Sequence, residues 1–450
     1  MPAVKVAFVG GGSAQWAPKI TTDLVLTREL SGSHLVLYDI DPKALERTHP
    51  LARRIAQEAG TGWHISATTD RVAALDGADY VILCIRVGGV EGMWADLEIP
   101  LRYGIHQTVG DTVGPGGLSR ALRHIPVAVA LAREMERRCP GAWLINLTNP
   151  MTTICRAVTK ATSVPTIGLC HEVVNVLHDL ADHFEVDVED VQVRAAGINH
   201  FVWILEMRVG ERDGFALLRD YLAEHNPFER LPPKVGGDQG GAKDWHSSFE
   251  DHWAIKFLLF QRYGAFPAAG DRHIIEFFPW FLTEATGWGR RYGVSPTTYE
   301  FRLQELEYRR QRARQMLAQK KPLVLKRSRE QAVRVITALA TGKPARFIIN
   351  VPNTGQVASL PLGAVVESFA YVGANGVEPI CVGPLPPAIQ ELVLGHVLRQ
   401  EMIAETALRS DRDLALQALS ADPLVSDWER APQMLDEMLA ANREYLPQFK

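Results

Sequence analysis

A glycine-rich loop directly after the first strand pattern constrains the fold of this chain more than any other feature. Val4 to Val9 is typical of a buried strand, Gly10-Gly11-Gly12-Ser13 follows it, and Trp16 to Leu26 has the pattern of a helix. Glycines allow the backbone to approach a pyrophosphate, and a helix N-terminus supplies free amides and a positive dipole end. Gln15 replaces the usual third glycine, but the succession still predicts a Rossmann-like dinucleotide-binding unit.

The second strand pattern, Leu35 to Asp39, ends in a carboxylate. At this position in a dinucleotide-binding unit, a carboxylate can accept hydrogen bonds from both ribose hydroxyls. A 2′-phosphate would instead face the negative charge of Asp39. The sequence therefore favours NAD over NADP.

Further strand patterns alternate with helical ones through the first half of the chain, which predicts a parallel sheet covered by helices. These strands are expected at Tyr80–Ile85, Ala142–Asn146 and Thr166–Cys170. Pro126 interrupts a helical stripe between Leu118 and Val129 and should kink or divide that helix. We expect an α/β fold with a Rossmann-like domain, similar to lactate and malate dehydrogenases, over residues 1–190.

The second half is expected to form an α+β catalytic domain over residues 191–450. Val191 to Ile204 has the pattern of paired strands, and Asn226 to Lys243 is rich in Pro, Gly and charge, which predicts a mobile loop. Beyond about Glu305 the pattern is mostly helical, with one strand at Ala345 to Val351.

Composition excludes several classes of partner. The formal net charge of −4 does not favour nucleic acid, and no apolar stretch approaches the roughly 20 residues of a membrane span. The N-terminus shows no basic region followed by an apolar run, so no secretory signal is expected. Five cysteines without close pairing are typical of free thiols in a reducing cytoplasm.

Two dipeptides carry side chains suited to a metal ion, Cys170-His171 at a strand end and Asn199-His200 further on. A Cys170 thiolate and a His200 imidazole could hold one divalent ion and leave room for substrate oxygens and water. The alternative is that Cys170 is a buried structural cysteine. His171 could equally be a hydrogen-bonded loop histidine or a catalytic one.

Three more polar clusters lie in loop contexts. Asp111 belongs to the glycine-rich run 110–117, Asn149 follows a predicted strand, and Asp271-Arg272-His273 follows a small-residue run. Turn chemistry and helix capping would explain each cluster alone. Together they place many polar groups at loop positions where a ligand could meet them.

These motifs, taken in order, resemble glycoside hydrolase family 4 over nearly the whole chain. The motifs that carry the resemblance are Val9-Gly10-Gly11-Gly12-Ser13, Gly110-Asp111-Thr112-Val113-Gly114-Pro115-Gly116-Gly117, Thr148-Asn149-Pro150, Cys170-His171-Glu172-Val173 and Gly197-Ile198-Asn199-His200-Phe201. The tetrad Cys170 to Val173 is similar to that of the α-galacturonidase branch, and the run Gly264 to His273 agrees with it.

The resemblance implies a glycosidase that depends on NAD and manganese, unlike glycosidases that use two carboxylates. In such an enzyme NAD removes hydride from C3 of the sugar, and the resulting ketone acidifies the C2 proton. A base removes this proton, the C1 substituent is eliminated, water adds at C1 and the hydride returns. The net reaction is hydrolysis.

The resemblance also implies roles for individual residues. Asp111, near the metal and the C2 and C3 oxygens, His171 and Asp271 are expected to be catalytic, with Asp271 as the base because the tyrosine of related branches has no counterpart that we can place. His171 would protonate the leaving oxygen or bind a hydroxyl. The metal ligands would be Cys170 and His200; the cofactor contacts Gly10, Gly12, Ser13 and Asp39; the substrate contacts Arg86, Asn149, Arg272 and His273.

A uronide substrate carries a C6 carboxylate that needs a cation, and Arg272 with His273 is the expected reader. α-Glucosidase, α-galactosidase and α-glucuronidase are alternatives within the family. An NAD-dependent 2-hydroxyacid dehydrogenase and a non-enzymatic NAD sensor are alternatives outside it. The family also implies a homodimer or homotetramer that acts on a small α-glycoside.

Overall fold

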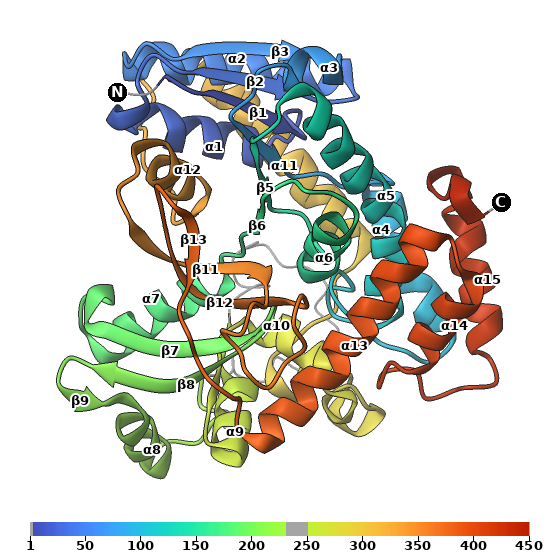
Figure 1. Ribbon diagram of the computed structural model, residues 1–450. Coiled ribbons are helices and arrows are strands. Elements are labelled where there is room, and N and C mark those ends of the chain that lie inside the picture. The colour runs from blue at the N-terminus through green and yellow to red at the C-terminus, as the bar shows by residue number, and fades with distance from the viewer. Residues whose placement is uncertain (1–2, 231–250, 450) are drawn as a thin grey trace.

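The computed structural model describes residues 3–230 and 251–449, so most of the predicted mobile loop at 226–243 lies outside the described residues. One 13-stranded sheet runs through both halves of the chain (Figure 1). Its order is β10-β8-β7-β12-β11-β6-β5-β4-β1-β2-β3, with β13 beside β12 and β9 beside β8.

The strands from β3 to β6 in this order run parallel and form the Rossmann-like part, at the top and centre of Figure 1. They are β1 Lys5–Val9, β2 His34–Tyr38, β3 His64–Thr68, β4 Tyr80–Leu83, β5 Trp143–Asn146 and β6 Thr166–Gly168. The order 3-2-1-4-5-6 reverses between β1 and β4, and ligands bind outside the carboxyl ends of the strands at such a switch point. The predicted α/β class and the Rossmann-like sheet are confirmed.

The remaining strands extend this sheet in antiparallel fashion. They are β7 Val191–Ile198, β8 Phe201–Val209, β9 Arg212–Asp213, β10 Phe266–Pro267, β11 Ala345–Pro352, β12 Val365–Gly373 and β13 Gly376–Pro379. The predicted strand pair after residue 190 is β7 and β8, and the predicted strand at Ala345 is β11. Strands β3, β9, β10, β12 and β13 were not predicted, and the domain division at residue 190 stays a prediction.

Helices cover the sheet and fill the space beside it. Their bounds are α1 Trp16–Val25, α2 Pro42–Ala59, α3 Arg71–Leu75, α4 Gly89–Arg102, α5 Gly114–Arg138, α6 Met151–Ala161, α7 Glu172–Phe184, α8 Gly214–Glu224, α9 Ala254–Tyr263, α10 Asp271–Ile274, α11 Tyr299–Ala318, α12 Ala332–Thr341, α13 Pro387–Arg409, α14 Arg412–Ser420 and α15 Ala431–Ala441. Among the described residues, no helix is both long and apolar enough to cross a membrane.

Helix α5 is continuous through Pro126, so of the two expected effects the division of this helix is wrong, and the kink stays a prediction. A proline inside a helix removes one backbone hydrogen bond. Ile125 and Val129, on either side of it, are both buried in the same core cluster, and this packing holds the helix together across the missing bond.

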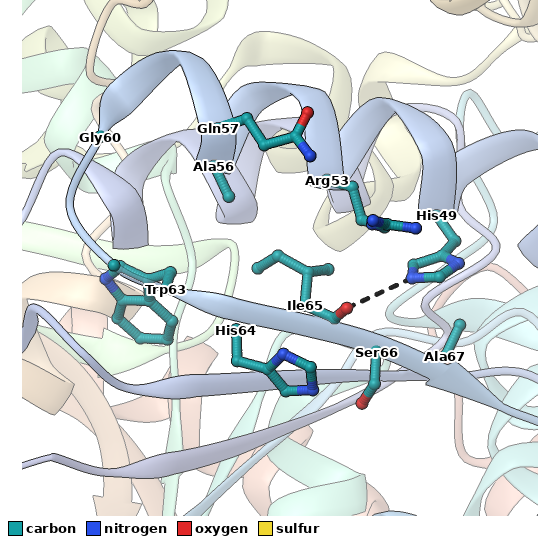
Figure 2. A pocket seen from close by; sticks show the side chains of 11 residues that line it. His49, Arg53, Ala56, Gln57, Gly60, Trp63, His64, Ile65, Ser66 and Ala67 are labelled. Carbon is teal, nitrogen blue, oxygen red and sulfur yellow. Dashed lines mark hydrogen bonds between the residues drawn. The ribbon is translucent and has the colours of Figure 1, made fainter.

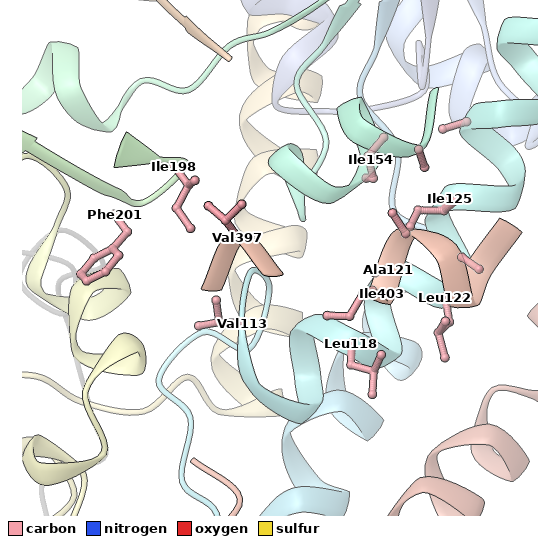
Figure 3. Close-up of a cluster of buried hydrophobic side chains, with 14 of the residues drawn as sticks. Val113, Leu118, Ala121, Leu122, Ile125, Ile154, Ile198, Phe201, Val397 and Ile403 are labelled. Carbon is pink, nitrogen blue, oxygen red and sulfur yellow. The ribbon is translucent and has the colours of Figure 1, made fainter. Parts of the chain in front are cut away.

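The largest core cluster joins the two halves of the chain (Figure 3). Phe201 and Ile198 of the β7–β8 hairpin, Leu118 of α5 and Val397 of α13 all contribute to it. A second cluster on the other side combines α1 and the parallel strands with Val335 and Ile336 of α12. The antiparallel half is therefore packed onto the Rossmann-like half through shared apolar cores.

Candidate active site

The glycine-rich loop folds tightly between strands β1, β2 and β4. Gly10 has a φ of +98°, and a Cβ at this residue would lie 2.0 Å from the carbonyl oxygen of Cys84. The amides of Gly10 and Gly11 donate to the carbonyl of Tyr38 at 2.9 and 2.8 Å. Only glycine allows the backbone to lie this close to its neighbours, which is the role of glycine in a dinucleotide-binding turn.

Asp39 and Ser13 complete the nucleotide loop. The Asp39 carboxylate accepts the amide of Gly12 at 2.9 Å, and the Ser13 hydroxyl accepts the amide of Trp16 at 3.1 Å, where helix α1 begins. The predicted cofactor residues are thus brought together at the carboxyl ends of β1 and β2. Their arrangement fits a dinucleotide, because the three successive glycines carry no side chain that would fill the cradle.

Asp111 lies at the centre of the polar groups beyond this loop. Its carboxylate accepts the Asn149 side-chain amide at 3.0 Å and the Thr112 hydroxyl at 2.7 Å. The imidazole nitrogens of His200 and His273 lie 3.8 and 3.9 Å from it. Burial opposes ionisation, but these imidazoles lower the pKa of Asp111 below its ordinary value. Asp111 is therefore an anion at neutral pH.

The tight turn of the β7–β8 hairpin presents His200 to this carboxylate. His200 is 3% exposed and adopts a left-handed φ of 63°, which is uncommon for a residue other than glycine. Its Nδ1 lies 2.8 Å from the Thr112 hydroxyl. Since that hydroxyl donates its one proton to Asp111, its lone pair is left to accept Nδ1–H of His200. This tautomer frees Nε2 as a ligand atom.

His273 completes a group that could hold a divalent ion. Ligand atoms of Asp111, His200 and His273 all lie within 4.8 Å of one another. Burial and the neighbouring His273 lower the pKa of His200 to about 3, so this imidazole is neutral, as a metal ligand must be. The Nδ1 atom of His273 is buried and has no hydrogen-bond partner. The carboxylate suits manganese, and the imidazoles suit divalent transition metals more generally.

Cys170, the predicted partner of His200, does not belong to this group of three. It is buried in an apolar cluster with Met151, Cys155 and Val365. Burial raises the pKa of the Cys170 thiol well above its ordinary value, and the carboxylate of Glu367 adds to this effect. A bound cation would have to displace the thiol proton.

His171 is half-exposed beside two carboxylates. Its Nε2 lies 3.3 Å from Glu172 and its Nδ1 4.0 Å from Glu330. Burial lowers the pKa of His171, but these carboxylates outweigh it and raise the pKa above the ordinary value. His171 can therefore carry a proton near neutral pH.

Arg86 follows strand β4. Its side chain is exposed to solvent, although many protein atoms surround its guanidinium. Desolvation of its guanidinium by the surrounding protein atoms, together with the positive charges of Arg120 and Arg302, lowers the pKa of Arg86 to about 10. Several cations thus lie near one another on this side of the site. Such a group attracts an anionic ligand.

The carboxylate of Asp271, the predicted base, is buried and hydrogen-bonded to other residues of the protein. Its carboxylate accepts the Lys256 ammonium at 3.2 Å and the amides of Ile255 and Lys256 at 3.1 and 3.2 Å. It is 3% exposed, and burial raises its pKa to about 6. These contacts join α10 to α9, and the structure does not place Asp271 in the Asp111 group.

The guanidinium of Arg272, on the same short helix, is hydrogen-bonded within the protein. Its Nη2 donates to the Thr297 hydroxyl at 2.7 Å and to the Thr108 carbonyl at 3.3 Å. Burial and the positive charge of Arg302 lower its pKa to about 10, so it remains a cation.

Sequence reasoning missed three buried charged residues near the site, Lys256, Glu276 and Glu367. Glu276 lies one helical turn after His273, a spacing that could have singled it out. Glu367 lies in β12, a strand that was not predicted. Lys256 lies among apolar residues in the sequence, which gives no sign of a function. Only its contact with Asp271 in the folded protein marks it as part of a buried charged group.

A separate surface depression lies at the far edge of the sheet (Figure 2). It is lined by α2, β3 and the connection between them, including His49, Arg53, Gln57, Trp63 and His64. No predicted site residue lines it, so it is distinct from the candidate active site.

Comparison with known proteins identifies the same architecture elsewhere. A family model described as family 4 glycosyl hydrolase matches residues 5–186, and a model of its C-terminal domain matches residues 195–425. An alpha-galacturonidase of Bacillus subtilis is 36% identical over 97% of this chain and 97% of its own length. An alpha-galactosidase of the same organism is 33% identical over 99% of this chain and 100% of its own length.

Among solved structures, a 6-phospho-alpha-glucosidase from gut microorganisms in complex with NAD and Mn²⁺ superposes with a TM-score of 0.83. It is 22% identical, and the alignment covers 100% of both chains. At this identity the likeness concerns the fold alone.

Proposed function

The chain belongs to family 4 of the glycosyl hydrolases, and we propose that within this family it hydrolyses α-D-galacturonides with NAD and Mn²⁺ as cofactors. The observation that carries the proposal is the group of Asp111, His200 and His273. Asn149 joins it to the carboxyl ends of the parallel strands, where the nucleotide loop also lies. The alpha-galacturonidase named above and the tetrad Cys170 to Val173 support the uronide.

When bound, NAD would take up and return the C3 hydride, and Mn²⁺ would polarise the C2 and C3 oxygens. Gly10, Gly12, Ser13 and Asp39 bind the dinucleotide in this proposal. His200 and Cys170 are the metal ligands that the resemblance implies, and Asp111 and His273 are added because their ligand atoms lie beside His200. Asn149 and Arg86 bind the sugar. In these assignments the cofactor is bound by the glycine-rich loop, and the metal ion by a different group of residues.

Two residues are proposed to move protons. His171, with its raised pKa, donates a proton to the leaving oxygen. Asp271 is the base that the sequence predicts for C2, and D271N tests it. If Asp271 is the base, D271N should abolish exchange of the C2 proton with solvent. If its carboxylate only joins α10 to α9, D271N should instead lower the stability of the fold.

Aryl α-glycosides that differ only at C4 and C6 test the substrate. We expect kcat/KM for the galacturonide to exceed that for the galactoside, glucoside and glucuronide. No stoichiometric NADH should accumulate at 340 nm, in contrast to a 2-hydroxyacid dehydrogenase. Faster cleavage of a neutral glycoside would contradict the proposed substrate.

Hydrolysis in D₂O tests the elimination. The released sugar should carry deuterium at C2, because the proton removed there exchanges with solvent before the hydride returns. Product without deuterium at C2 would exclude this mechanism.

Arg272 is proposed to bind the C6 carboxylate. R272A should reduce kcat/KM for the galacturonide by about 10- to 100-fold more than for the galactoside, the factor that a charged hydrogen bond supplies. T297V is the matched control, because it removes a protein partner of Arg272 and keeps the cation. Equal losses on both substrates in R272A would show that Arg272 does not bind the carboxylate.

The predicted homodimer or homotetramer and the cytoplasmic location complete the proposal. Sedimentation equilibrium of the purified chain and fractionation of the source cells are the corresponding measurements.

A further inference from the structure

Glu276 lies in the short 3-10 turn that continues helix α10, one helical turn after His273. It is 1% exposed, and a buried carboxylate requires strong partners. Its Oε1 accepts the backbone amides of Val109 and Gly110 at 2.6 and 2.9 Å, and it lies 3.2 Å from the Thr108 hydroxyl. One oxygen atom therefore holds the peptide segment that immediately precedes Asp111.

Thr108, at the start of this segment, is also bound to Thr297 and Arg272, whereas the amides of Val109 and Gly110 donate to Glu276. Gly110 adopts a left-handed φ of 64°, and a Cβ there would lie 2.6 Å from a methyl group of Leu97. Glycine permits this conformation but does not enforce it, because it is the most flexible residue. The bonds from Glu276 supply the constraint that glycine lacks.

The same bonds connect two separate parts of the metal group. Asp111 comes from the loop that Glu276 holds, and His273 comes from the helix that continues into Glu276. The Asp111 and His273 ligand atoms are 3.9 Å apart. Fixing the loop to the helix therefore fixes this separation, to which the affinity for a divalent ion is sensitive.

We propose that Glu276 is a positioning residue that fixes Asp111 opposite His273 and so preorganises the divalent-ion site. The inference rests on the metal site of the proposed function but not on the identity of the sugar. Glu276 contacts neither the sugar nor the cofactor in this role.

The test compares E276A with E276Q in the full-length chain. E276A leaves two buried amides without an acceptor, whereas the E276Q carbonyl oxygen can still accept them. Isothermal titration with MnCl₂ should show a Kd at least about tenfold higher for E276A, and within about threefold of wild type for E276Q. The Kd for NAD should stay within about twofold in both, because the glycine loop is untouched.

Two further measurements separate positioning from general destabilisation. Hydrogen exchange of the peptide spanning 105–112 should accelerate in E276A and not in E276Q. D23A is the matched control, since Asp23 is also buried and accepts a backbone amide, that of Ser328 at 2.8 Å. It should lower the melting temperature without changing the Kd for Mn²⁺.

Unchanged Mn²⁺ affinity in E276A, or equal losses in E276A and E276Q, would overturn the inference and leave the proposed glycosidase intact. Failure of the wild type to cleave galacturonides while it still binds Mn²⁺ would overturn the substrate and leave the role of Glu276 intact. A wild type that binds no Mn²⁺ would overturn both.

Discussion

At the scale of single residues, Glu172 connects two motifs that are distant in the sequence. Its carboxylate accepts the amide of Gly270 at 2.5 Å and lies 3.3 Å from His171. A Cβ at Gly270 would lie 3.0 Å from the same carboxylate. The tetrad Cys170 to Val173 is therefore in direct contact with the segment that carries Arg272 and His273.

The contact between Glu172 and His171 predicts a titration. E172Q should lower the pKa of the His171 imidazole relative to wild type, because burial would be opposed by Glu330 alone. Histidine NMR signals of the metal-free protein, followed between pH 5 and 9, measure this value. E330Q is the control and should produce a smaller shift, since Glu330 lies 4.0 Å away. An unchanged pKa in E172Q would contradict the assignment.

Glu367 is a second residue whose ionisation the fold alters. It is 1% exposed and accepts the Asn199 amide at 3.2 Å. Burial raises its pKa from 4.5 to about 7. Because the pKa of Glu367 is higher in the folded than in the unfolded state, the protonated carboxyl stabilises the fold. This contribution to the free energy of unfolding is complete below the unfolded-state pKa and is lost as pH rises through about 7.

This linkage predicts the pH dependence of stability. Between pH 5 and 8, the free energy of unfolding of the wild type should fall relative to that of E367Q by at most roughly 3 kcal/mol, since the amide imitates the protonated acid. Urea unfolding of both proteins in the presence of a chelator measures the difference. A constant difference across this range would show that Glu367 titrates normally.

At the scale of elements, a buried ion pair joins helices α4 and α5. The Asp96 carboxylate accepts both terminal nitrogens of Arg123 at 2.7 Å, and the two side chains are 0% and 1% exposed. Helix α4 precedes the Asp111 loop and helix α5 follows it, so this pair joins the two helices that flank the loop.

Removing one partner should be costly, because the other charge would remain buried. D96A should reduce the free energy of unfolding by about 3–5 kcal/mol, and the double variant D96L/R123M should recover much of this loss. R412A, which breaks an exposed pair with Asp436, is the control and should cost less than about 1 kcal/mol. Urea denaturation measures all three. A small effect of D96A would indicate that water reaches the pair.

At the scale of the whole molecule, the sheet and the core cross the expected boundary between domains. Strand β11 pairs with β6 through Asn350 and Gly168, although these residues are 182 positions apart in the chain. The main core cluster combines residues of both halves, such as Leu122 of α5 and Ile389 of α13.

This shared core predicts one cooperative unfolding transition. Peptides from residues 3–190 and 251–449 should lose protection against hydrogen exchange at the same urea concentration, because neither half can expose its core surface independently. Mass spectrometry of the exchanged chain resolves the two sets of peptides. Transitions at clearly different urea concentrations would support two domains divided near residue 190.

The sequence by itself determined the local elements of the nucleotide-binding half and the chemistry of the motifs. The strand before Gly10, the carboxylate at Asp39 and the hairpin carrying His200 all follow from patterns over a few residues, which local sterics and hydrophobic periodicity control. For the same reason the motif residues Asp111, Asn149 and His273 could be singled out before their contacts were known.

Only the tertiary structure decided which of these residues meet. Asp111 and His273 are 162 positions apart, and no local rule brings them within 3.9 Å. Burial likewise decided that Asp271 contacts Lys256 and that Glu276 holds the Asp111 loop. Such pairings depend on the packing of whole elements, and so do the shifted pKa values, because desolvation depends on every atom that excludes water.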